Sequence, residues 1–299
     1  CSIFSFLSAG LMLLPAAAVL LTGVPLVKTV YLSPICGNVD FVIDPLSAFF
    51  VIVISLMSFL GTVYANGYMK PYLDKGMNVS SHCFFLMMLI ASMLMVVTVQ
   101  NALFFLIVWE VMSLSSFFLV IFEGEKKEVI KAGVKYLVYM HFSVLFILAA
   151  FVMLNLHSGS MNFADFAAYA HQGDKFASLI FMLAFIGFGI KAGFVPFHNW
   201  LPDAHPAAPS HVSAVMSGVM IKTGLYGILR VLFMLGTPTK SVAYTVFVIA
   251  LVTALYGILY ALAQRDLKKL LAYSSIENIG IIGLGIGLGM IGLAYENPL

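Results

Sequence analysis

The chain has 299 residues, a formal net charge of +2, 62% hydrophobic residues and only 9% charged residues. Soluble domains carry about 25% charged residues, so this composition excludes a soluble globular protein and indicates a polytopic membrane protein. The few basic residues are scattered over short loops. They form no basic surface of the kind that binds nucleic acid, and no nucleic-acid partner is expected.

Nine apolar runs are long enough to cross a bilayer, which takes about 20 residues. The third and fourth are joined only by Gln100 and Asn101, which predicts a tight hairpin. Residues 161–171 (MNFADFAAYAH) are typical of a short amphipathic helix at the membrane interface. In chain order, the nine runs are residues 3–27, 45–67, 82–99, 102–122, 131–154, 176–197, 208–234, 241–263 and 271–295.

The basic residues predict the orientation of these spans, because cytoplasmic loops carry an excess of Lys and Arg. The loops on the other side carry only Lys28, Lys175 and Lys240, with Arg230 near its boundary. The first span is therefore expected to start in the cytoplasm. The eight basic residues on the predicted cytoplasmic side are Lys70, Lys75, Lys126, Lys127, Lys131, Arg265, Lys268 and Lys269.

Both ends of the chain lie next to apolar runs. Cys1 stands inside the first run, and Glu296 directly follows the last one. This pattern is typical of a piece of a longer polypeptide. We expect residues 1–299 to form a single transmembrane domain of that polypeptide.

Four ionisable side chains interrupt the apolar runs. A charge at the bilayer centre costs about 2.5–3.5 kcal/mol on insertion scales, and such residues usually line a polar path or an ion site inside a helix bundle. They are therefore the first candidates for functional residues. The four are Glu110, Lys191, Lys222 and Glu277.

Each of these residues has a functional and a structural interpretation. Glu110 either pairs with a cation or is a neutral carboxyl bonded to a neighbouring helix. Lys191 lies among Gly187, Gly189, Gly193 and Pro196, which predicts a helix broken in mid-membrane. The alternative for this lysine is a side chain that reaches back to the interface.

Lys222 is near the centre of its run and has no short route to either interface. A buried lysine has a lowered pKa, which a nearby carboxylate raises again, so it is suited to carrying protons. Lys135, with His141 two turns further on, could oppose Glu110. Because Lys135 is near a helix end, a side chain that reaches the interface is an equal alternative.

The last run opens with a polar cluster, Ser274, Ser275, Glu277 and Asn278, which could hydrate a channel from the cytoplasm or simply mark the start of a helix. A second group follows Pro196. Its three prolines and Trp200 favour a rigid re-entrant loop over a metal site, which needs convergent ligands. The chain has no nucleotide, haem or CxxC motif, and no cofactor is expected in it. The titratable members of the second group are His198, Asp203, His205 and His211.

Two long segments resemble a known family. Residues 191–230 (KAGFVPFHNWLPDAHPAAPSHVSAVMSGVMIKTGLYGILR) and 265–280 (RDLKKLLAYSSIENIG) are similar to the antiporter-like membrane subunits of respiratory complex I, Mrp antiporters and energy-converting hydrogenases. The resemblance covers about residues 40–299. It implies an all-α inverted-repeat bundle in which one helix near Lys191 is discontinuous. It also implies that the family's first helix and most of the second repeat lie outside this sequence.

The resemblance also implies roles for individual residues. Glu110 matches the family's glutamate, and Lys135, Lys191 and Lys222 match three of its lysines, which together form the proton relay. With Glu277 they make up our predicted relay. Further polar residues expected to assist the relay are His141, His205, Ser274 and Asn278.

The sequence Glu277-Asn278-Ile279-Gly280 distinguishes branches of the family. Complex I relatives usually have Ser-His before Met-Gly here, whereas the ENIG form resembles the hydrogenase-4 and formate hydrogenlyase membrane subunits. The resemblance therefore implies an ion-translocating subunit, itself without redox chemistry, in a prokaryotic cytoplasmic membrane. Its expected partners are other membrane subunits, a peripheral hydrogenase or dehydrogenase arm, lipid, and protons or Na⁺. The alternatives are a subunit of NADH-quinone oxidoreductase (complex I), a cation/proton antiporter of the Mrp kind, and a purely structural anchor.

Overall fold

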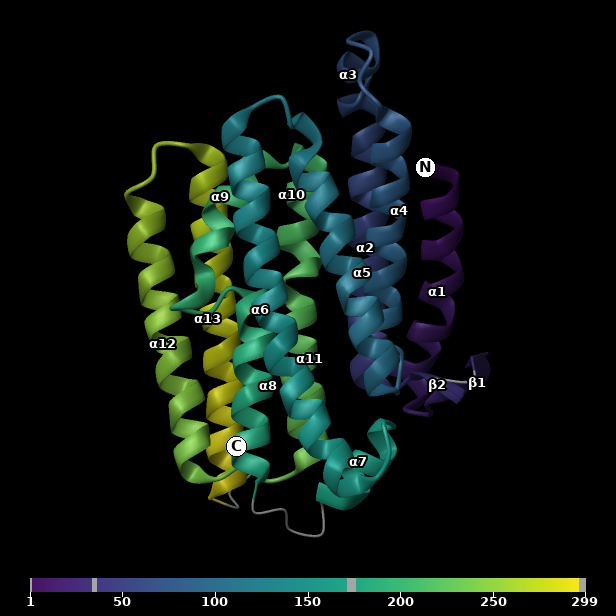
Figure 1. Ribbon diagram of the computed structural model, residues 1–299, viewed down its shortest axis with the longest axis vertical. Helices are drawn as coiled ribbons and strands as arrows, with labels where there is room; N and C mark the ends of the chain where they lie inside the picture. The colour runs from purple at the N-terminus through teal and green to yellow at the C-terminus, as the bar shows by residue number, and fades with distance from the viewer. Residues whose placement is uncertain (1, 34–36, 171–175, 296–299) are drawn as a thin grey trace. The chain divides into compact units, whose positions relative to one another are not determined.

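The computed structural model describes residues 2–33, 37–170 and 176–295 (Figure 1). Among them, eight helices are long and apolar enough to cross a membrane, and they match eight of the nine predicted spans. In the remaining run, 3–27, α1 (Ser2–Thr22) ends before the run does, and the last two residues of the run begin a β-strand. The described apolar part of α1, Gly10–Thr22, is shorter than a full span. The chain is a predominantly helical integral membrane protein, and it divides into two compact units.

Unit 1 comprises residues up to 137 together with 207–226. Within it α1 packs on α2, and α4 packs on α5 as a hairpin (Figure 1). In chain order its elements are α1, β1 (Leu26–Ser33), β2 (Gly37–Ile43), α2 (Pro45–Tyr68), α3 (Lys70–Asp74), α4 (Val79–Val96), α5 (Ala102–Val120), a 3-10 turn (Ile121–Glu123), the start of α6 (Lys127–Ser158), α10 (Ser210–Val215), a π-helical turn (Met216–Met220) and the start of α11 (Lys222–Leu235).

The antiparallel pair β1–β2 was not predicted from the sequence. It is fixed to the connection between α4 and α5, where the Val42 amide donates to the Thr98 carbonyl at 2.8 Å and the Gln100 amide donates to the Asp40 carbonyl at 2.9 Å. Asn101 then caps α5, its side chain accepting from the Phe104 amide. The predicted tight hairpin of α4 and α5 is confirmed.

Unit 2 comprises residues 138–206 and those from 227 onwards. The predicted short helix over 161–171 is present as α7, while residue 171 lies outside the described residues. Helices α12 and α13 pack against each other (Figure 1). The elements are the rest of α6, α7 (Phe163–Ala170), α8 (Ala177–Ala192), a 3-10 turn (Phe197–Trp200), α9 (Leu201–Ala207), the rest of α11, α12 (Lys240–Leu262) and α13 (Leu267–Ala294).

The predicted helix break near Lys191 is confirmed. Helix α8 ends at Ala192 because Gly193 adopts φ 92°, a left-handed conformation that favours glycine. The Gly193 amide donates back to the Gly189 carbonyl. Beyond the break, the Val195 amide donates to Thr253 Oγ1 at 3.1 Å, which anchors the non-helical segment to α12.

Candidate functional site

The spans that carry the two mid-membrane lysines are the most buried of the eight. Ala177–Ala207 and Ser210–Leu235 each have 67% of their apolar window buried, against 33% for Lys127–Ser158 and Lys240–Leu262. Ionisable residues on interior helices do not face lipid. Lys191 and Lys222 therefore belong to the protein interior.

Lys191 lies in the last turn of α8, and its side chain is 0% exposed. A lysine that reached back to the interface would expose its ammonium group, so full burial contradicts that alternative. The C-terminal end of a helix also favours a positive charge. The same end is held by Trp200, whose indole Nε1 donates to the Ile190 carbonyl at 2.9 Å.

Lys222 is half-buried at the start of α11, directly after the π-helical turn. Its Nζ donates to the Ser217 carbonyl, which lies inside that turn. Widened turns of this kind leave carbonyl groups available to side chains and often occur at functional sites. The irregular backbone thus supplies the lysine with a polar partner in an apolar span.

Glu110, in α5, belongs to a polar cluster inside unit 1 and is itself half-buried. Tyr136 lies within electrostatic reach of the Glu110 carboxyl and makes a 2.5 Å hydrogen bond with the Ser116 hydroxyl. Lys135, half-buried on α6, directly precedes Tyr136 in the chain. That Lys135 opposes Glu110 stays a prediction.

A side-chain contact connects α5 with the start of α11. The Thr223 hydroxyl lies 3.7 Å from Met112 Sδ, and Thr223 also donates to the Met220 carbonyl at 2.7 Å. Met112 is two residues from Glu110, and Thr223 is adjacent to Lys222. The structure therefore brings the Glu110 and Lys222 segments together within unit 1.

The other predicted relay residues belong to unit 2. Glu277 is half-buried on α13, with its backbone against Gly257 of α12. In the polar cluster around it, Asn278 is exposed and its side-chain amide donates to the Ser274 carbonyl at 2.9 Å. His141 is exposed on α6, whereas His205 is buried in α9.

The histidines that follow Pro196 are divided between the two units. His198 packs against the Tyr256 ring, with centroids 4.5 Å apart. His211 instead belongs to unit 1, where its Nε2 lies 2.7 Å from Nε2 of His82. The described residues contain no group of three or more His, Cys, Asp or Glu side chains that could hold a metal ion.

His82 was missed by the sequence analysis. It lies 129 residues from His211, and each stands alone near the start of its helix. No local spacing indicates such a pair. The sequence offers one signal: both histidines lie at span ends that the basic loops place on the cytoplasmic side.

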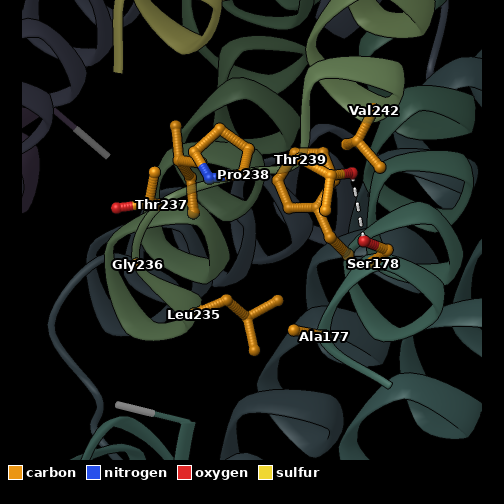
Figure 2. Close-up of a pocket in the computed structure, with 10 residues that line it drawn as sticks. Ala177, Ser178, Leu235, Gly236, Thr237, Pro238, Thr239 and Val242 are labelled. Atoms are coloured by element: carbon orange, nitrogen blue, oxygen red, sulfur yellow. Dashed lines mark hydrogen bonds between the residues drawn. The ribbon is translucent and has the colours of Figure 1, made fainter. Parts of the chain in front are cut away.

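A cavity of about 230 Å³ lies in unit 2, between the start of α8, the end of α11 and the start of α12 (Figure 2). It is lined by apolar side chains and by the hydroxyls of Ser178, Thr237 and Thr239. The Ser178 and Thr239 hydroxyls are 3.2 Å apart. None of the predicted relay residues lines this cavity.

Two families of known proteins match the chain. The NADH:quinone oxidoreductase/Mrp antiporter transmembrane family matches residues 99–295. The N-terminal family of chain 5 of NADH-ubiquinone oxidoreductase (complex I) matches residues 35–79. Together they cover most of both units.

Among individual proteins, hydrogenase-4 component B of Escherichia coli K12 is 46% identical over 86% of this chain and 38% of its own length. NADH-quinone oxidoreductase subunit M of Rickettsia bellii is 33% identical over 82% of this chain and 48% of its own length. The chain thus spans less than half the length of either relative. In fold, it is similar to a chain of the Mrp complex from Dietzia sp. DQ12-45-1b, with a TM-score of 0.81 at 23% identity over 98% of this chain and 56% of that one.

Proposed function

This chain belongs to the NADH:quinone oxidoreductase/Mrp antiporter transmembrane family, and from that membership we propose that it translocates protons as a membrane subunit of an oxidoreductase complex. The observation that carries the proposal is the position of the two interior lysines. Lys191 stands at the end of a broken helix, and Lys222 stands directly after a π-helical turn. Non-helical backbone at membrane depth is tolerated where it lines a polar interior.

In this proposal the relay consists of residues that can gain and lose a proton. The protonation of Lys191 is controlled by Glu110, Lys222 passes the proton inward, and Glu277 makes the later connection. Lys135 assists Glu110, and His141, His205, Ser274 and Asn278 are auxiliary polar groups. The chain itself needs no cofactor, because redox chemistry in partner subunits supplies the energy.

The proposed complex is of the group 4 nickel–iron hydrogenase or formate hydrogenlyase kind, in a prokaryotic cytoplasmic membrane. The ENIG sequence at 277–280 and the 46% identity to a hydrogenase-4 component support this choice. The alternative is a subunit of NADH-quinone oxidoreductase or of an Mrp-type antiporter, which similarity to subunit M and to the Mrp complex supports. Co-purification of the full-length protein separates these cases, since a peripheral hydrogenase or dehydrogenase arm accompanies only an oxidoreductase subunit.

Proton uptake by inverted membrane vesicles tests the function. Vesicles from cells with the full-length protein in its complex are energised with H₂, formate or NADH, whichever the wild type oxidises. Lys191→Ala and Glu110→Gln are expected to abolish proton uptake at normal complex levels. The matched control is Lys240→Ala, because Lys240 lies at a helix end with its ammonium 3.9 Å from the Tyr295 ring. If both relay variants assemble and take up protons normally, the proposed function is wrong and a structural anchor is the remaining interpretation.

Measuring uptake with and without Na⁺, and with a protonophore, tests which ion is translocated. In a proton-translocating subunit, uptake is expected to be independent of Na⁺ and to collapse with a protonophore. An Na⁺-translocating subunit would instead need Na⁺, and a protonophore would then accelerate Na⁺ accumulation.

A further inference from the structure

His82 and His211 form a buried imidazole pair in unit 1. His82 lies in the first turn of α4 and His211 at the start of α10, and their side chains are 3% and 1% exposed. Their Nε2 atoms are 2.7 Å apart. One ring must donate and the other accept, so exactly one proton lies between them.

The second nitrogen of each ring, Nδ1, faces away from the Nε2–Nε2 hydrogen bond. Within the described part of the chain, Nδ1 of His82 and Nδ1 of His211 have no hydrogen-bond partner. When both rings are neutral, the donor ring has a lone pair on Nδ1 and the acceptor ring has a proton there. A buried polar atom without a hydrogen-bond partner lowers the stability of the fold by about 1–3 kcal/mol. The pair therefore adds little to the stability of the fold.

Aromatic rings and hydroxyls connect this pair with the surface of unit 1. The Phe122 ring packs on His82 at 4.7 Å, and the Tyr68 ring packs on His211 at 5.4 Å. Next to His211, the Ser210 hydroxyl lies 3.5 Å from the Tyr68 hydroxyl. These contacts come from α2, α10 and the 3-10 turn, all of which belong to unit 1.

The hydroxyl chain continues to a surface carboxylate. The Tyr68 and Tyr72 rings lie with centroids 5.9 Å apart, and the Tyr72 hydroxyl donates to Glu123 Oε1 at 2.7 Å. Burial, together with Glu123, raises the pKa of Tyr72, so its hydroxyl keeps its proton and acts as a donor. Glu123 has a 25% exposed side chain and pairs with exposed Lys126. Among the described residues, the titratable groups that these contacts link to the histidine pair are Tyr68, Tyr72 and Glu123, with Lys126 outermost.

We propose that His82 and His211 form the site at which unit 1 takes up protons from the side that the basic loops predict to be cytoplasmic. A proton from the Glu123–Tyr72–Tyr68–Ser210 chain binds the lone pair on Nδ1 of one ring. The Nε2 proton of that ring moves to Nε2 of the other, whose Nδ1 proton leaves towards the interior. One proton enters and one leaves, and the pair returns to two neutral rings of exchanged tautomer. This inference rests on the proposed function and specifies where its protons enter.

The test measures proton uptake by inverted vesicles with the full-length protein in its complex. His82→Gln and His211→Gln are expected to slow uptake by about a hundredfold or more, the lower end of the usual range for loss of a proton-transferring group. The deficit should grow from acid to alkaline pH, because uptake at the altered site then depends on free protons. The matched control is His157→Gln, since His157 is exposed in the last turn of α6 and bonds the Met153 carbonyl.

Two comparisons separate this site from the proposed function. Normal uptake in His82→Gln, with uptake abolished in Glu110→Gln, overturns the uptake site and leaves the function intact. Normal uptake in both variants overturns the function as well. A loss that is equal at every pH indicates a structural role for the pair and also overturns the site.

A second variant keeps the test decisive if the histidine variants do not assemble. Tyr72→Phe retains the ring that packs on Phe122 at 5.5 Å and removes the hydroxyl that donates to Glu123. It is expected to reproduce the pH-dependent slowing of proton uptake. Wild-type uptake in an assembled Tyr72→Phe complex overturns the proposed route.

Discussion

The backbone of Glu277 lies directly against Gly257, where an added Cβ atom would come within 2.4 Å of the Glu277 amide nitrogen. Gly280 approaches the Ala254 backbone in the same way. The two helices α12 and α13 can pack this closely because glycine has no side chain at either contact. This close approach fixes the position of Glu277, since neither backbone can move without separating the two helices.

Gly257→Ala is expected to lower the free energy of unfolding by about 1–3 kcal/mol, the usual cost of overpacking a well-packed contact. The midpoint of thermal unfolding of the detergent-solubilised protein measures this effect. Gly285→Ala on α13 is the control, because a Cβ there has no neighbour within 4 Å. Equal midpoints for the two variants would contradict the close packing.

Gly193→Ala is expected to destabilise the break after Lys191. A left-handed conformation costs a non-glycine residue about 1–2 kcal/mol, and the new Cβ would lie 2.9 Å from Leu201 Cδ1. Gly159→Ala shares the positive φ, at 71°, but has open space around its Cβ. Both variants should lose stability in thermal unfolding, whereas only Gly193→Ala should lose proton uptake. Loss of uptake in both would show that backbone strain alone is responsible.

Trp200→Phe removes the hydrogen bond to the Ile190 carbonyl and keeps a buried ring. A buried carbonyl that loses its partner costs about 1–3 kcal/mol, so the variant should unfold at a lower temperature. Because Ile190 precedes Lys191, proton uptake should fall as well. Trp109→Phe, on α5 in unit 1, is the comparison. Unchanged stability and uptake in Trp200→Phe would argue against the indole as the support of the α8 end.

Lys222→Arg tests whether this residue must release a proton. Arginine keeps a positive charge near the Ser217 carbonyl but stays protonated in proteins. We therefore expect a complex that assembles at normal levels and takes up no protons. Lys240→Arg, at the start of α12, should behave as the wild type. Substantial uptake by Lys222→Arg would mean that a fixed charge is sufficient at this position.

Much of the fold could be predicted because the signals are local. A run of about 20 apolar residues specifies a span wherever it occurs, and eight such spans are present among the described residues. The break after Lys191 is local too, since Gly193 and Pro196 act on their own stretch of backbone. The β1–β2 pair was missed because its strands depend on pairing with each other and with the Thr98–Gln100 connection.

The sequence by itself determined the membrane class, the spans and the ionisable residues within them, because hydropathy and the cost of a buried charge depend only on which side chains follow one another. Only the tertiary structure decided which polar groups meet. It placed His82 beside His211 across 129 residues and Tyr136 beside Ser116 across 20. It also placed the π-helical turn before Lys222. Such pairs form because packing brings distant helices together, and no spacing along the chain records that approach.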